Sequence, residues 1–150
     1  MKRLSAAALT VITLSSTAGA ADLPQWVKGP VSGLVFGCEE AKQKAPKPAA
    51  YVTQGDLDGD GKPDYVVEIA KGCQANRDLY CNDEGCLIDL YVSTNYGQMG
   101  SFKVKSFKIG RQGTKPALFI IRAGAACAKE PSGVCSETLI FNGEKFTKAP

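Results

Sequence analysis

The sequence contains no histidine. Catalysis by a Ser-His-Asp or Cys-His arrangement needs an imidazole as its base, so both arrangements are excluded. A zinc site is disfavoured as well, because the chain offers neither histidine nor a C-x2-C pair of cysteines. There is also no phosphate-binding glycine loop, since the glycines between residues 55 and 61 stand among carboxylates that would repel phosphate.

Long apolar runs are missing too. The longest, residues 4–14, is well short of the ~20 residues that a membrane span needs. It follows a basic start, Lys2 and Arg3, and gives way to small residues that end at Ala20. This layout is typical of a secretory signal peptide, residues 1–20, whose cleavage would leave one globular domain, residues 21–150. We therefore expect a periplasmic or secreted protein that does not insert into a membrane.

A strong charge of either sign is absent. The chain has 18 basic and 15 acidic residues, and loss of Lys2 and Arg3 with the signal would bring the two nearly into balance. Near-neutrality argues against nucleic acid as the main partner. We expect a monomer whose partner is a protein or an envelope polymer.

Six cysteines are present, all after residue 20. An even number in an exported chain predicts three disulfides, for which 15 pairings exist. Two pairs, Cys81 with Cys86 and Cys127 with Cys135, are close enough in sequence for each to close a loop or hairpin. The best prediction therefore pairs the remaining two, Cys38 and Cys73, and ties the N-terminal segment to the sheet.

Periodicity predicts an α+β fold with an N-terminal helix and an antiparallel β-meander of about six or seven strands, stapled by disulfides. The helix is expected over residues 31–44, where Val31, Leu34, Val35 and Cys38 have i, i+3, i+4, i+7 spacing. A separate short helical turn is expected over residues 22–27. Strands are predicted by the β-branched and aromatic residues of segments 51–54, 64–70, 86–92, 102–109, 115–122, 137–141 and 145–148.

Two of these strands carry more specific predictions. In segment 102–109, Phe102 and Val104 have even parity and Phe107 and Ile109 odd parity, which predicts a bulge or bend between them. The lysines of this segment (Lys103, Lys105 and Lys108) either discourage aggregation on an outer strand or form a basic ribbon for an anionic partner. Segment 115–122 is apolar on both faces and is expected to be a central strand.

The most informative stretch is QGDLDGDGKPD, residues 54–64, which places four aspartates within nine residues. Counted from Asp56, oxygen donors at positions 1, 3 and 5, a glycine at 6 and a backbone carbonyl at 7 match the first half of an EF-hand loop. Position 12 is Val67 and a strand follows, so this is not an EF-hand. The alternative is a metal-free turn whose carboxylates cap backbone amides.

The D-x-D-G-D-G-x-x-D pattern leading into an apolar strand resembles the calcium-binding Asp loops of FG-GAP and integrin-type β-propeller blades. The resemblance covers residues 51–69 and implies a structural calcium ion held by Asp56, Asp58, Asp60 and Asp64 and by the carbonyl of Lys62. A propeller needs several blades, so its fold is not transferred. The whole chain also resembles small exported bacterial proteins of unknown function, through Leu23-Pro24, Cys38, the Asp loop and the Cys127/Cys135 pair.

These patterns predict an exported, calcium-stabilised binding or structural domain without catalytic activity. The alternative is a small hydrolase that uses two carboxylates, for which Glu39, Glu40, Glu68 and Asp89 are candidates by chemistry alone. A further alternative is a secreted inhibitor or effector that presents an exposed loop, residues 124–133. A pocket with two converging acids outside the Asp loop would favour the hydrolase, whereas a filled core with shallow grooves would favour the binding domain.

Overall fold

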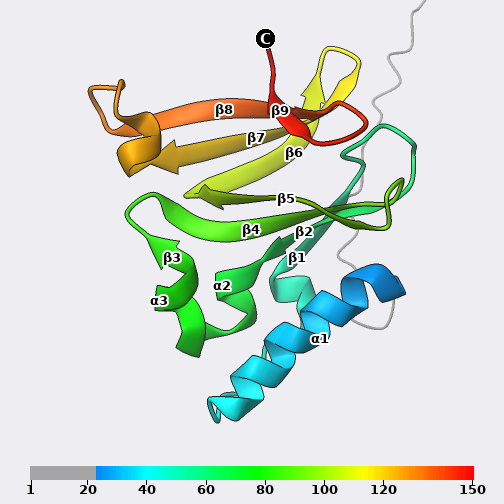
Figure 1. Cartoon of the computed structure of the whole chain (residues 1–150), viewed down its shortest axis with the longest axis vertical. Coiled ribbons are helices and arrows are strands. Elements are labelled where there is room, and N and C mark those ends of the chain that lie inside the picture. Colours follow the sequence, from blue (N-terminus) through cyan, green and yellow to red (C-terminus); the bar gives the residue numbers. More distant parts are fainter. Residues whose placement is uncertain (1–22) are drawn as a thin grey trace, which may run out of the picture.

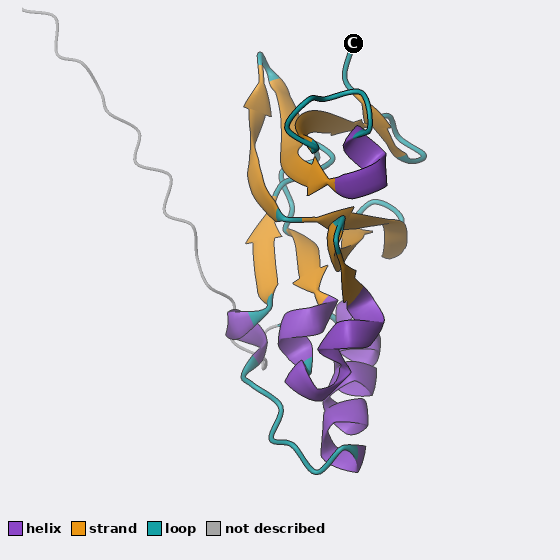
Figure 2. Ribbon diagram, turned by 90° about the vertical axis from the view of Figure 1, so that its left-hand side faces the viewer, coloured by secondary structure: helices purple, strands orange, loops and turns teal. Residues whose placement is uncertain are grey.

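The computed structural model describes residues 23–150, so the expected signal peptide lies outside the described part of the chain. The described residues form three layers: helices, a five-stranded sheet and a four-stranded sheet (Figure 1). Figure 2 shows the main helices gathered at one end, below the strands. The α+β class, the N-terminal helix and the antiparallel pairing agree with the prediction, but nine strands form two sheets in place of one meander.

Along the chain, the helical segments other than the last alternate with the strands of the first sheet, and the second sheet follows. The helical segments are α1 (Gln25–Glu40), η2 (Pro48–Ala50), α2 (Ile69–Gly72), η3 (Gln74–Asn76), α3 (Arg77–Tyr80) and η4 (Gly124–Cys127). The first sheet contains β1 (Val52–Gly55), β2 (Asp64–Glu68), β3 (Cys81–Asn82), β4 (Gly85–Val92) and β5 (Gly97–Val104). The second contains β6 (Ser106–Gln112), β7 (Lys115–Ala123), β8 (Val134–Phe141) and β9 (Phe146–Lys148).

Helix α1 differs from the prediction at both ends. It begins at Gln25, because the carbonyl of Pro24 accepts the N–H groups of Val27 and Lys28, and the predicted short turn is its first part. Pro30 lies inside the helix on an exposed position. The helix ends at Glu40 because the chain turns through a left-handed residue, Lys42, with φ 56°. No helix among the described residues has the length and apolar character needed to cross a membrane.

The chain passes from the first sheet to the second at Lys105, between β5 and β6. This is the bend that the change of parity predicted. It allows Phe102, Phe107 and Ile109 to pack against one core. Strand β7 lies between β6 and β8, which confirms the predicted central strand. Its outer face is only partly covered, since Phe119 and Ile121 remain more than a third exposed.

The first sheet is the middle layer and buries both of its faces. On one face, Ile88, Leu90 and Val92 of β4 pack against Leu118 and Ile120 of β7 and their neighbours. On the other face, residues of β2 and β4 (Tyr65, Val67 and Tyr91) pack with residues of α1 (Val27 and Val31). Each such apolar side chain contributes roughly 1.5–3 kcal/mol by leaving water, so the two cores hold the three layers together.

The three disulfides have the predicted pairing. Cys38–Cys73 joins α1 to the segment after α2, Cys81–Cys86 joins β3 to β4, and Cys127–Cys135 closes the loop between β7 and β8. No free cysteine is left among the described residues. Three disulfides are consistent with an oxidising compartment.

Candidate metal centre

The Asp loop connects β1 to β2 and projects from the end of that hairpin, where Gly55 pairs with Asp64. Its tight course depends on Gly59 and Gly61, whose φ angles of 90° and 79° are rarely adopted by other residues. Side chains cap the turn from within, because Asp56 Oδ1 accepts the N–H of Gly59 at 2.6 Å. The N–H of Asp60 bonds to Asp58 Oδ1 in the same way. The loop is therefore folded locally by its own aspartates.

Asp64 is the fully buried member of the loop, with 0% exposure. Its Oδ2 accepts the N–H groups of Leu57 at 2.6 Å and Asp58 at 3.1 Å, and its Oδ1 accepts the N–H of Ser93 at 2.7 Å. Burial raises the pKa of Asp64 above its ordinary value, although the N–H donors of Ser93 and Leu57 oppose this effect. The nearby Asp58 carboxylate raises the pKa further. Asp64 is thus a buried acid beside a second acid, an arrangement that a cation would stabilise.

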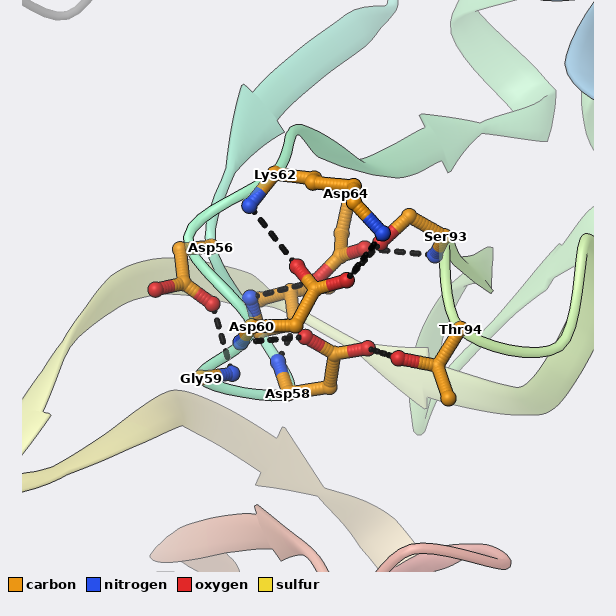
Figure 3. A network of polar contacts seen from close by, with 9 residues as sticks. Asp56, Asp58, Gly59, Asp60, Lys62, Asp64, Ser93 and Thr94 are labelled. Atoms are coloured by element: carbon orange, nitrogen blue, oxygen red, sulfur yellow. Dashed lines mark hydrogen bonds and ion pairs between the residues drawn. The ribbon is translucent and has the colours of Figure 1, made fainter.

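The turn between β4 and β5 covers the loop and supplies residues that the sequence analysis missed. The Ser93 hydroxyl donates to Asp60 Oδ2 at 3.0 Å, and the Thr94 hydroxyl donates to Asp58 Oδ2. Figure 3 shows both side chains on a turn that faces the Asp loop, directed at its aspartates. The available signal was weak: two hydroxyl residues directly after the apolar strand of residues 86–92.

Three of the four predicted aspartates come together. One carboxylate oxygen from each of Asp56, Asp58 and Asp64 lies within 4.8 Å of the other two, as expected for ligands of one ion. Asp60 is not in this group. Its carboxylate instead contacts Lys62, whose Nζ lies 3.3 Å from Oδ2 and whose N–H donates to Oδ1 at 2.7 Å.

The contacts of Asp60 also determine its electrostatics. The N–H of Lys62 lowers the pKa of the Asp60 carboxyl, and the Ser93 hydroxyl and the Lys62 ammonium add to this effect. The predicted role of Asp60 as a ligand would require its side chain to turn from Lys62 and Ser93 toward the other three carboxylates. The side chain of Lys62 is thus paired with the Asp60 carboxylate. The backbone carbonyl of Lys62 is the group that the resemblance implies as a ligand.

The donor set fits a hard cation. Every side-chain donor is a carboxylate oxygen, the kind of ligand that Ca²⁺ and Mg²⁺ prefer and that softer metals do not. The hydrogen bonds within the loop leave donor capacity, because a carboxylate accepts at about four positions and only one, from Gly59, is in use on Asp56. The same hydrogen bonds also agree with the alternative interpretation, in which the loop is a metal-free turn whose carboxylates cap backbone amides.

The four acids considered for a hydrolase do not converge. Glu68 pairs with Ile88 and lies on the face of the first sheet toward the second sheet, whereas Asp89 pairs with Val67 and lies on the helix side. The other two, Glu39 and Glu40, are exposed at the end of α1. These positions offer no two-carboxylate site from the predicted set.

The segment proposed for an inhibitory loop, residues 124–133, is compact. It contains η4, is closed by Cys127–Cys135, and is joined at its ends by the N–H of Gly124 and the carbonyl of Gly133 at 3.0 Å. Its outer residues, 128–132, are exposed. The segment is therefore a disulfide-closed loop that joins the end of β7 to the start of β8.

Comparison with known proteins yields no relative. No protein-family model, curated protein or solved structure matches the chain. Assignment of function consequently depends on the residues and geometry described above.

Proposed function

We propose that this protein is an exported binding domain whose β1–β2 loop holds a structural calcium ion, and that it has no catalytic activity of its own. The observation that carries the proposal is the convergence of Asp56, Asp58 and Asp64 around one point, with Asp64 buried. Three carboxylates so close repel one another unless a cation lies among them. We propose calcium over magnesium because the donors of the loop are all oxygen and its spacing resembles that of calcium loops.

The ion's proposed role is to stabilise the fold. The loop joins β1 to β2, and Ser93 and Thr94 connect it to the β4–β5 turn, so a bound ion would fasten both hairpins of the first sheet. A loop without the distal glutamate is expected to bind with a dissociation constant on the order of 10⁻⁴–10⁻³ M, as extracellular calcium modules do. At about 100 times that constant, the ion would add ~2.7 kcal/mol to the free energy of unfolding.

Binding of another molecule is proposed because no converging acids were found among the hydrolase candidates, while both cores are filled by apolar side chains. The three disulfides fix this shape in an oxidising compartment, where a small rigid domain can present a preformed surface. We propose a periplasmic or secreted location and a protein as the partner class, with an envelope polymer as the alternative.

The decisive test is thermal unfolding of the oxidised protein in calcium at about 100 times the expected dissociation constant (roughly 10–100 mM), in magnesium at the same concentration and in chelator. We expect calcium to raise the melting temperature by on the order of 10 °C relative to chelator, given ~2.7 kcal/mol and the size of the domain. The variant Asp56→Asn/Asp58→Asn should lose this shift, because asparagine keeps the capping oxygen but removes the charge.

The matched control is Asp78→Asn/Glu144→Gln, which removes two acids from exposed positions elsewhere and should keep the calcium shift. Equal melting temperatures for the wild type in calcium and chelator would refute the metal site. An equal shift with magnesium would reassign the ion.

A further inference from the structure

A groove opens between the two sheets, at the side where the chain crosses at Lys105. One part of it, with a volume of about 270 Å³, lies among α2, α3, β3, β4 and the Lys105 corner. A second part, of about 530 Å³, continues along β6 over the edge of β1, with Thr53, Gln54, Phe107 and Ile109 in its walls. Both parts share the stretch from Lys105 to Phe107 and also Glu68 and Lys71, so the two parts adjoin and are together called the groove.

The rim of this groove is basic. Lys71, Arg77, Lys105 and Lys108 approach it from α2, α3, the corner and β6, and all four are exposed. In the part of the chain that the structure describes, Glu68 is the only acid in its walls, and its carboxylate already pairs with Lys71 at 2.7 Å. Within the described residues, the other three cations have no ion pair. The near-neutral chain therefore concentrates an excess of positive charge along one groove.

The groove also offers free strand edges. Within residues 23–150, strand β1 ends the first sheet and pairs only with β2, and strand β6 ends the second sheet and pairs only with β7. Residues 53–54 and 106–109 of these two edge strands line the groove. An edge strand presents unpaired N–H and C=O groups that can pair with a further extended chain. The half-buried apolar side chains of the groove, Phe107 and Ile109, can contact alternate side chains of such a segment.

From this combination we infer that the groove binds an extended, acidic segment of a partner protein. The backbone of that segment adds to the free edge of β6 or β1, and its acidic side chains meet Lys105, Lys108 and Arg77 while its apolar side chains face the groove floor. The basic rim selects for the acidic sequence, and the strand edge selects for a polypeptide over a polysaccharide. The inference rests on the proposed binding function and names its partner class.

This placement also separates the three lysines of segment 102–109. Lys105 and Lys108 line the groove, whereas Lys103 pairs with Leu87 in the first sheet and is not among the lining residues. A general role against aggregation would apply equally to all three. The structure thus assigns recognition to two of them.

The test measures fluorescence anisotropy of a labelled peptide of about ten residues that alternates valine and glutamate. We expect saturable binding that weakens when salt shortens the screening length to about 3 Å, at 1 M. The variant Lys105→Glu/Lys108→Glu should bind at least about tenfold more weakly, because like charges replace complementary ones. The control Lys44→Glu/Lys47→Glu makes the same change in net charge at exposed positions away from the groove and should bind as the wild type does.

Two further probes identify the partner class. A valine–glutamine peptide should bind at least about tenfold more weakly if the basic rim contributes, and a backbone N-methylated valine–glutamate peptide should also bind weakly if a strand edge is used. Tight binding of polygalacturonate with equal binding of the N-methylated peptide would overturn the peptide assignment in favour of an acidic polymer. Absence of binding by the unmodified valine–glutamate peptide at millimolar concentration would overturn the inference.

The melting curves of the same samples keep this result separate from the metal proposal. Peptide binding measured in calcium and in chelator tests the groove, whereas the calcium shift of the melting temperature tests the Asp loop. A folded groove variant that retains the calcium shift and full peptide affinity would refute the groove alone.

Discussion

The buried carboxylate of Asp64 accepts the backbone N–H of Ser93 at 2.7 Å and thereby joins two hairpins that are distant in sequence. The same carboxylate holds the N–H groups of Leu57 and Asp58, so it organises its own loop as well. An acid with this position is a structural element whether or not an ion is bound. Substitutions at Asp64 are therefore expected to affect stability even in chelator.

Replacement of Asp64 by alanine is expected to destabilise the protein by more than about 3 kcal/mol, because it leaves three backbone donors without an acceptor at a cost of roughly 1–3 kcal/mol each. Asp64→Asn should cost less, since its remaining oxygen still accepts. Chemical denaturation in chelator measures both. A matched alanine substitution at exposed Asp83 should change the free energy of unfolding by no more than about 0.5 kcal/mol; an equal effect of both alanine substitutions would contradict the role given to Asp64.

The pH dependence of stability should report on Asp89. Burial raises its pKa, although hydrogen bonds from Ser101 and Gln98 lower it in part. The folded protein therefore holds this proton more tightly than the unfolded chain, and the charged carboxylate costs stability. We expect the wild type to lose stability relative to Asp89→Asn as pH rises from near 4 through the raised pKa. Urea titrations at several pH values measure the difference, and a constant difference between the two proteins would contradict the assignment.

The disulfides should contribute unequally. Cys38 and Cys73 are 35 residues apart, and Cys81 and Cys86 are 5 apart, so the first constrains the unfolded chain more. Replacing both partners by alanine should cost about 3–4 kcal/mol for the first pair and about 2 kcal/mol for the second. Denaturation of the two double variants, with the remaining pairs oxidised, measures the ranking. The reverse order would show that native-state strain or residual unfolded structure dominates.

Two glycines should respond in opposite ways to alanine. Gly33 lies on the exposed side of α1 with open space around it, so Gly33→Ala should stabilise the protein by about 0.5–1 kcal/mol. At Gly85, φ is 132° and an added Cβ would lie 2.3 Å from the carbonyl of Val104. Gly85→Ala should therefore destabilise by about 3 kcal/mol or more. Thermal unfolding of both variants tests the pair, and tolerance of alanine at residue 85 would mean that the β4–β5 packing adjusts.

The sequence was sufficient where a structural feature depends on local spacing. The Asp loop, the Cys81–Cys86 and Cys127–Cys135 disulfides and the change of parity at Lys105 were all visible as short-range patterns, and the Cys38–Cys73 disulfide followed by elimination. The start of α1 was missed because the apolar spacing was counted from Val31, whereas Val27, one turn earlier, packs in the same core and carries the helix past Pro30. Local propensity was overridden by packing.

The remaining features depend on contacts between distant segments. Ser93 reaches Asp64 through its backbone, and no side-chain pattern encodes that approach. The division of the strands into two sheets was likewise hidden, because a bend at one residue reads in sequence as either a bulge within a sheet or a passage between sheets. The groove follows from that passage and was equally invisible.

The single crossing at Lys105 divides the chain into a part that forms the first two layers and a part that forms the third. Helix α1 and the first sheet are complete by Val104, and the second sheet is built entirely from later residues. A chain that emerges from its N-terminus can therefore assemble the helical layer and the first sheet while the apolar face of Ile88, Leu90 and Val92 still lacks its cover. During that interval the exposed apolar face favours association with other molecules, and the interval ends when β7 has been synthesised and covers the face.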